Sequence, residues 1–294
     1  MSMSKESSYL PVTSNCQIVT LLKRQPHWVT NIFSKTLYSY FTEREIDTIL
    51  REVEKEDDLN DKKIYDRFRE KIKEKPAPTS TVDLANRGKG RAKDVMGFFN
   101  KGTFKKGDRY LDLGGGNGTV SFAVGTELGL EEENIICADI NTWFDDPDRT
   151  QKVTYVILDE DKDLPDGKDE EFEHDGEFQL ITCFQSLHHM KNVNGRLISC
   201  RRINKKGGAI VIREHDCIND DMRMLIDIEH CIFELVLKEY NQKFVDSYFA
   251  DYKSKQQWHD IFRALGYKYI STSYPQRFGK FNPTRFYYAM YVKI

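Results

Sequence analysis

The spacing of apolar residues changes once along the chain, near residue 81. Over residues 31–75, apolar side chains recur at helical intervals in "NIFSKTLYSYFTEREIDTIL" and then thin out into a charged stretch. The segment "PAPTST", residues 76–81, combines two prolines with small polar residues and predicts a linker. We therefore expect an N-terminal helical extension with its linker over residues 1–81 and a second domain over residues 82–294.

Beyond residue 82, short apolar runs alternate with helical ones, which is typical of a sheet built from βαβ units. The chain closes with two further β-like runs that predict a hairpin. We expect an α/β fold whose parallel core has a ligand crevice at the carboxyl ends of its strands. Strands are expected at residues 109–114, 134–140, 153–159, 178–187, 207–216, 267–275 and 285–294, and helices at 85–101, 119–128, 192–203, 220–240 and 254–266.

Composition narrows the class of protein. The chain has 294 residues, of which 31% are charged and 39% hydrophobic, so it can bury a globular core. It has no run of about 18 apolar residues and no apolar secretion signal, so we expect no membrane partner and a cytoplasmic location. Its six cysteines include no CxxC pair, which predicts free thiols and no metal requirement. The net charge of −3 counts against a protein that grips long nucleic acid such as DNA.

A glycine-rich turn follows the first expected strand. Asp112, Gly114, Gly116 and Gly118 spell D-x-G-x-G-x-G between a strand and a helix. Glycine allows positive φ and close approach of a ligand, and the helix amides offer hydrogen-bond donors to an anionic group. The third glycine comes one residue earlier than in the dinucleotide fingerprint, which weakens a nicotinamide interpretation. Asp139, 27 residues after Asp112, ends the second strand, where an acid accepts hydrogen bonds from ribose hydroxyls.

Together, "YLDLGGGNG" and "ICADIN" resemble the class I S-adenosylmethionine-dependent methyltransferases over about residues 105–294. The resemblance implies a Rossmann-like fold, with a seven-stranded, mostly parallel sheet and an antiparallel last strand. It implies S-adenosylmethionine as cofactor, with Asp112 among the cofactor-binding residues, the loop from Gly114 to Gly118 around its methionine part and Asp139 at its ribose. In "VILDEDKDLPD", Asp159 would approach the adenine amino group, with Asp161 as a rival; either acid could instead be solvated loop charge.

The end of the fourth expected strand, "ITCFQSLHHM", lacks the motifs of amide, amino and ribose methylases. It resembles the corresponding stretch of messenger RNA cap guanine N-7 methyltransferases, with Gln185 and His189 matching and Ser186 and Met190 departing. Guanine N-7 carries a lone pair and needs no base, so catalysis there is mostly alignment. By this resemblance the partner is a capped RNA, GTP or a cap-like acceptor, with other capping-enzyme domains alongside. The pattern suggests a large DNA virus, and hence a virion or host cytoplasm.

Further candidates come from the same resemblance. The helix "NRGKGRAKDVMGFF" would supply side chains to cofactor and cap, and the aromatic last strand would bring a tyrosine near the base. The implied cofactor ligands are Lys89 and Phe184, and the implied acceptor ligands are Asn86, Arg91 and Tyr288. The basic set on this helix could equally be a solvated face.

Two other functions remain open. "SLHHMKN" also resembles the turn of small-molecule O- and N-methyltransferases, in which His188 or His189 would act as a general base with a near-neutral pKa. Alternatively, one histidine faces the crevice and the other only caps a turn. The third possibility is a catalytically inactive, regulatory subunit, against which the intact glycine loop and Asp139 argue.

The fifth expected strand ends in four polar residues, "REHD" (213–216). Packing of a strand requires none of them, and alternation puts Glu214 and Asp216 on one side and Arg213 and His215 on the other. They could be a salt-linked strand end that holds the next loop. In the functional interpretation, a carboxylate accepts from guanine N-1 and its amino group. The proposed catalytic set is Gln185, His189 and Glu214, with His188 and Asp216 in acceptor binding.

Overall fold

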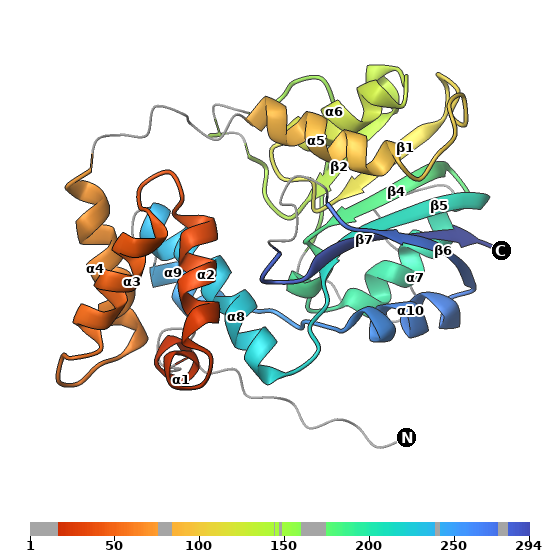
Figure 1. The fold of residues 1–294 in the computed structure, drawn as a ribbon. Helices are drawn as coiled ribbons and strands as arrows, with labels where there is room; N and C mark the ends of the chain where they lie inside the picture. The colour runs from red at the N-terminus through yellow and green to blue at the C-terminus, as the bar shows by residue number, and fades with distance from the viewer. Residues whose placement is uncertain are drawn as a thin grey trace. The chain divides into compact units, whose positions relative to one another are not determined.

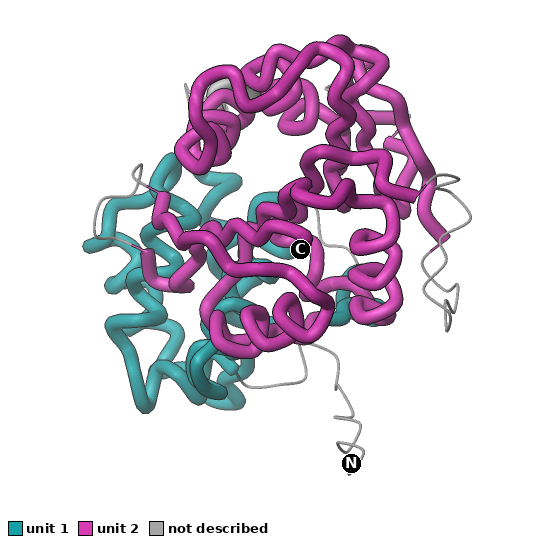
Figure 2. The backbone as a smooth tube through the Cα atoms, turned by 90° about the vertical axis from the view of Figure 1, so that its right-hand side faces the viewer, with its two compact units in different colours: residues 1–81, 217–249 teal, residues 82–216, 250–294 magenta. Residues whose placement is uncertain are grey.

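The computed structural model describes residues 17–75, 84–143, 145–146, 149–159, 175–238, 242–275 and 282–294. The chain forms two compact units (Figure 2), one of Met1–Thr81 with Cys217–Phe249 and the other of Val82–Asp216 with Ala250–Ile294. Residues 217–249 thus group with the N-terminal helices in this division, and the expected domain over residues 82–294 stays a prediction.

The second unit is built on one seven-stranded sheet in the order β3-β2-β1-β4-β5-β7-β6 (Figure 1). Neighbouring strands from β3 to β5 pair in parallel, whereas β7 pairs antiparallel with both β5 and β6. The expected fold class is confirmed. The strands are β1 (Arg109–Leu113), β2 (Ile135–Asp139), β3 (Thr154–Ile157), β4 (Phe178–Phe184), β5 (Asn204–His215), β6 (Tyr267–Ser273) and β7 (Phe286–Lys293).

Helices cover both faces of this sheet. Helices α5 (Leu84–Met96) and α6 (Thr119–Glu127) lie on one face, and α7 (Val193–Ile203) and α10 (Lys255–Ala264) lie on the other (Figure 1). Each face has its own apolar core, with Leu180 and Val211 under the first pair and Ile181 and Ile212 under the second. Because central strands are buried on both faces, they read as continuous apolar runs, as "LITCF" in β4 does.

The first unit is helical. Its elements are α1 (Gln17–Arg24), α2 (Pro26–Thr36), α3 (Glu43–Val53), α4 (Asp61–Lys73), α8 (Asp220–Cys231), the π-helical turn η3 (Ile232–Leu237) and α9 (Gln242–Ser247). Helix α1 lies before the helical stretch expected from residue 31. Among the described residues, no helix is long and apolar enough to cross a membrane.

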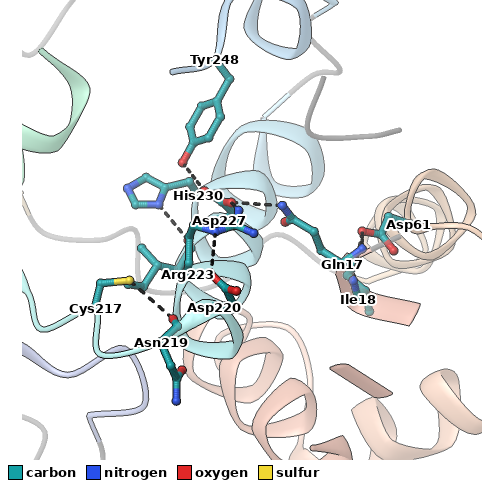
Figure 3. Close-up of polar contacts among 11 residues, drawn as sticks. Gln17, Ile18, Asp61, Cys217, Asn219, Asp220, Arg223, Asp227, His230 and Tyr248 are labelled. Carbon is teal, nitrogen blue, oxygen red and sulfur yellow. Dashed lines mark hydrogen bonds and ion pairs between the residues drawn. The ribbon is translucent and has the colours of Figure 1, made fainter. Parts of the chain in front are cut away.

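Polar side chains explain why residues 217–249 pack with the N-terminal helices. The amide of Gln17 donates to Asp227 of α8 over 3.1 Å, and Tyr248 donates to the same carboxylate (Figure 3). Lys35 of α2 pairs with Glu229 over 2.5 Å, both side chains being about 10% exposed. Buried groups of this kind require their partners, so they specify this packing.

Asp61 anchors the first turn of α1. Its carboxylate accepts the backbone N–H groups of Gln17, Ile18 and Val19 (Figure 3, where Gln17 and Ile18 are labelled). Helix N-termini have unpaired N–H groups and favour a negative charge. Burial nevertheless dominates, and it raises the pKa of Asp61 to about 6.

Candidate functional site

The order of strands reverses between β1 and β4, which is where ligands bind in open α/β sheets. The loop after β1 carries the glycines, and the loop after β4 continues into the short turn η2 (Leu187–His189). The two loops touch, because the Ser186 hydroxyl donates to the Leu113 carbonyl over 2.7 Å. Candidate residues from two distant motifs therefore meet at one edge of the sheet.

Asp112 lies beneath the glycine loop rather than in the crevice. It is 1% exposed, and its two carboxylate oxygens accept hydrogen bonds from Ser121 and Thr182, each over 2.7 Å. Burial raises its pKa, while these two hydroxyls act to lower it. Both oxygens point into the core, where they tie β1 to α6 and β4, so we expect Asp112 to hold the loop rather than to contact the cofactor directly.

The three alternating positions favour glycine, which has no side chain, for different structural reasons. All have φ between +62° and +77°. A Cβ on Gly114 would lie 2.4 Å from Cβ of Ser186, and one on Gly118 would lie 2.5 Å from the Tyr155 hydroxyl. Among the described residues, a Cβ on Gly116 would meet the Trp143 ring at 3.8 Å, an ordinary van der Waals distance. Two glycines thus permit close packing within the protein, whereas a side chain on Gly116 would clash with no described residue, so its backbone suits the approach of a ligand.

Asp139 lies beside this bare backbone. It accepts the N–H of Gly116 over 2.9 Å with one oxygen and the N–H of Asn141 over 3.0 Å with the other. Each carboxylate oxygen has a second lone pair, so hydroxyl donors can still be accepted. The Trp143 indole N–H is buried and has no hydrogen-bond partner among the described residues, which leaves a donor beside the loop. These features fit the cofactor that the sequence predicts, although the individual contacts stay predictions.

The other predicted cofactor ligands lie in different environments. Phe184 ends β4 and is 6% exposed, and Lys89 is exposed on α5. Asp159 has an exposed side chain, and its backbone carbonyl accepts from Arg196 over 2.6 Å. The rival Asp161 lies outside the described residues, as does the side chain of Asn86. These roles stay predictions.

Gln185 turns the chain sharply at the end of β4. It has φ of +55°, a left-handed conformation that costs a non-glycine residue about 1–2 kcal/mol. Its N–H donates to the Arg213 carbonyl, and its side chain lies 2.9 Å from Nε2 of His215. Since Nδ1 of His215 faces the Thr284 carbonyl at 2.9 Å, it must carry the proton, and Nε2 accepts from the Gln185 amide. The contact holds Gln185 in its strained turn and orients the His215 ring.

Glu214 is the best-satisfied acid at this edge. It is 1% exposed and accepts the Leu187 N–H over 3.1 Å with one oxygen. Its other oxygen lies 2.5 Å from Nδ1 of His188, which is fully buried. The pair ties the end of β5 to the η2 turn. Because both oxygens are bonded within the protein and the side chain is almost fully buried, we expect Glu214 to hold the fold here rather than to contact guanine.

Asp216 has a similar internal role. Its oxygens accept the backbone N–H of Lys255 over 2.9 Å, at the start of α10, and the guanidinium of Arg285 over 3.1 Å. This is the linked strand end that the sequence offered as an alternative. His189 is the more exposed of the two adjacent histidines, and its ring centre lies 4.2 Å from that of His188, with the two ring planes tilted by 55°.

Tyr288 does not offer a ring face to an acceptor. It is 1% exposed and packs edge-on against Phe184 beneath α5. Arg91, expected at the acceptor, lies over the Phe184 ring at 5.7 Å, and Arg213 lies 5.8 Å from the Tyr288 ring. Sequence reasoning gave no role to Arg87 or Trp143. It named Arg213 only as one of the four polar residues at the end of the fifth strand, some of which could bind the acceptor.

The arrangement as a whole separates two tasks. The loop after β1, with Asp139, can hold a nucleotide-like group against bare backbone. The carboxyl ends of β4 and β5 carry ionisable groups, of which Glu214, His215 and Asp216 are bonded to other groups of the protein. The expectation that no metal is required stays a prediction.

Comparison with known families gives one match, to a family described as "Methyltransferase domain", over residues 84–272. No curated protein matches the sequence.

Solved structures with a similar fold include S-adenosylmethionine-dependent methyltransferases. One, from Thermotoga maritima and described as a possible histamine N-methyltransferase, is 15% identical with a TM-score of 0.45, over 72% of this chain and 91% of that chain. Another, from Methanosarcina mazei, is 13% identical with a TM-score of 0.45, over 68% and 96%. A phosphoethanolamine N-methyltransferase of Haemonchus contortus, solved with S-adenosylhomocysteine, is 15% identical with a TM-score of 0.44, over 71% and 52%.

Proposed function

The chain belongs to the methyltransferase-domain family, and from that premise we propose that it methylates N-7 of the guanine in an RNA cap. S-adenosylmethionine is its cofactor and supplies a methyl group activated by the positive sulfonium. Gly116, Asp139 and Trp143 are the residues of this chain that would hold it. Gly116 gives bare backbone, Asp139 gives a carboxylate for ribose hydroxyls, and Trp143 gives a buried N–H donor.

The observation that carries the choice of acceptor is the state of the ionisable side chains at the ends of β4 and β5. Glu214 is bonded to His188 and to the Leu187 N–H, and His215 to Gln185 and the Thr284 carbonyl. Asp216 is bonded to Arg285 and to the start of α10. Groups committed in this way are poor proton acceptors for a substrate. The chemistry that suits them is attack by a lone pair that carries no proton, as at guanine N-7.

Recognition of the guanine then differs from the sequence-based expectation. Glu214 and Asp216 position the η2 turn and α10 instead of pairing with the base. His189 and Gln185 remain as candidates beside the reacting atoms, because both are only partly buried and follow directly on β4. A site that pairs with polar groups of the base would reject analogues lacking them.

One observation favours a second candidate, a small-molecule O- or N-methyltransferase with a histidine base. When Nδ1 of His188 donates to Glu214, the basic lone pair of the ring is on Nε2, and the carboxylate stabilises the protonated ring. Full burial of His188 counts against this role, because a base must reach the acceptor's proton.

The test uses RNA capped as GpppA and GpppG, incubated with the protein and methyl-labelled cofactor and then digested and separated. We expect label in N-7-methylguanine, and its loss in Asp139→Ala. Lys93→Gln, a change on the exposed side of α5, is the matched control and should retain the label. Label in ribose, or transfer only to small phenols or acids, would replace this proposal by the second candidate. Absence of transfer to every acceptor, with the cofactor bound, would favour the inactive subunit.

A further inference from the structure

Three arginines converge beside the end of β5, on the α5 face of the sheet. Arg87 and Arg91 are four residues apart on α5 and so lie on one side of that helix. Arg213 pairs with Phe184 on one neighbouring strand and with Tyr288 on the other, so its side chain lies on the same face as theirs. The guanidinium of Arg91 lies over the Phe184 ring, which connects the helix to this group.

Aromatic rings hold Arg213 in place. Its guanidinium lies 4.2 Å from the centre of the Phe286 ring and 5.8 Å from that of Tyr288. The residue is 8% exposed, and its Nη1 atom is buried without a hydrogen-bond partner among the described residues. A buried guanidinium nitrogen without a partner is costly, unless a ligand supplies the acceptor.

The cluster has an excess of positive charge. Burial first, and then the charges of Arg213 and Arg87, hold the pKa of Arg91 well below its usual range. Arg91 is partly exposed as a residue. Arg87 is more exposed, yet burial and Arg213 lower its pKa as well. The nearby acids have other contacts, Asp94 with the Tyr288 hydroxyl and Asp112 with Ser121 and Thr182.

We propose that Arg87, Arg91 and Arg213 form a binding site for a phosphate group of the methyl acceptor. One guanidinium group can form two hydrogen bonds to the oxygens of a phosphate. Three guanidinium groups carry more positive charge than one carboxylate would neutralise. The inference rests on the proposed methyl transfer at this edge of the sheet, although it does not require the acceptor to be guanine. The same anion chemistry could come from the carboxylate of the cofactor, so the experiment separates the two sources.

The experiment is calorimetry of inorganic pyrophosphate binding to the full chain, alone and with saturating S-adenosylhomocysteine. We expect pyrophosphate to bind in both conditions, and Arg213→Gln and Arg91→Gln each to weaken it at least about tenfold, the loss of one charged hydrogen bond. Arg87→Gln, at an exposed position, tests the site should Arg213→Gln fail to fold. Lys93→Gln on the same helix should bind pyrophosphate as the wild type does, and S-adenosylhomocysteine affinity should stay within about twofold throughout.

Three results would overturn the assignment. The first is no pyrophosphate binding by the wild type, and the second is equal binding by wild type and arginine variants. The third is loss of pyrophosphate binding when S-adenosylhomocysteine is present, together with weaker S-adenosylhomocysteine binding in the variants, which would assign the arginines to the cofactor. Normal pyrophosphate binding without label in N-7-methylguanine would reject the guanine proposal alone and leave the phosphate site standing.

Discussion

The glycine loop after β1 and the carboxyl ends of β4 and β5 present carboxylates in opposite ways. Among the described residues, Asp139 beside the loop is bonded to backbone N–H groups, and it keeps lone pairs for a ligand. Glu214 in β5 is bonded to a buried histidine and a backbone N–H, and is 1% exposed. Both lie at the carboxyl ends of strands of the same sheet. The hydrogen-bond partners of an acid at a strand end therefore decide its role. An acid at such a position can bind a ligand, or it can stabilise the fold.

The largest effect is expected for Glu214→Leu, which removes the hydrogen-bond acceptor of two buried donors, the Leu187 N–H and His188. We expect the free energy of unfolding to fall by about 3–5 kcal/mol, as for a buried pair that loses one member. Urea denaturation measures it, with exposed Glu133→Leu as a control that should change it by less than about 0.5 kcal/mol. A small effect on stability with a large loss of acceptor affinity would make Glu214 a ligand.

The loop side of the comparison is tested by Asp139→Ala. We expect S-adenosylhomocysteine to bind about 1.5–3 kcal/mol more weakly, the value of hydrogen bonds to a charged group. Asp112→Asn is the counterpart, because Asp112 bonds only within the core; it should lower stability and leave most of the affinity unchanged in the folded protein. Equal losses of affinity in both variants, measured by calorimetry, would contradict the separate roles.

A third buried carboxylate, in the helical unit, extends the comparison to pH. Burial raises the pKa of Asp61 to about 6, above the ordinary value of 3.8, so its proton stabilises the folded state. This contribution is fully present below about pH 4 and is lost as the pH rises through 6. Relative to Asp61→Asn, the wild type should lose about 1–3 kcal/mol between pH 4 and 7. A stability difference that does not change over this range, in urea denaturation, would contradict the buried state of Asp61.

The smallest effect concerns Gly116. Alanine there would meet the Trp143 ring without a clash but keeps φ of +62°, so we expect a loss of about 1–2 kcal/mol of stability. Gly129→Ala, with φ of +75° and no neighbour within 4 Å, should lose as much. Only Gly116→Ala should also weaken S-adenosylhomocysteine binding. Unchanged cofactor affinity in both variants would show that Gly116 does not approach the cofactor.

The sequence was sufficient to predict the sheet, because strands buried on both faces have continuous apolar runs and the glycines mark the turn after β1. It was insufficient to predict the hydrogen bonds of Asp112, because its partners Ser121 and Thr182 come from two other elements and belong to no motif. Residues 217–249 appeared to continue the second domain, since the contacts of Asp227 and Glu229 with Gln17 and Lys35 span about 200 positions. That Arg87, Arg91 and Arg213 lie together could not be predicted for the same reason, because they come from α5 and β5.

The central claim is that the edge formed by β4 and β5 aligns an acceptor without removing a proton. The most direct test is the single-turnover rate of methyl transfer to capped RNA, with cofactor and RNA saturating, over about pH 6 to 9. We predict a flat profile, because guanine N-7 keeps its lone pair throughout this range. A rate that rises through one pKa near the ordinary histidine value of about 6.5, and loses that rise in His188→Gln or His189→Gln, would contradict the account.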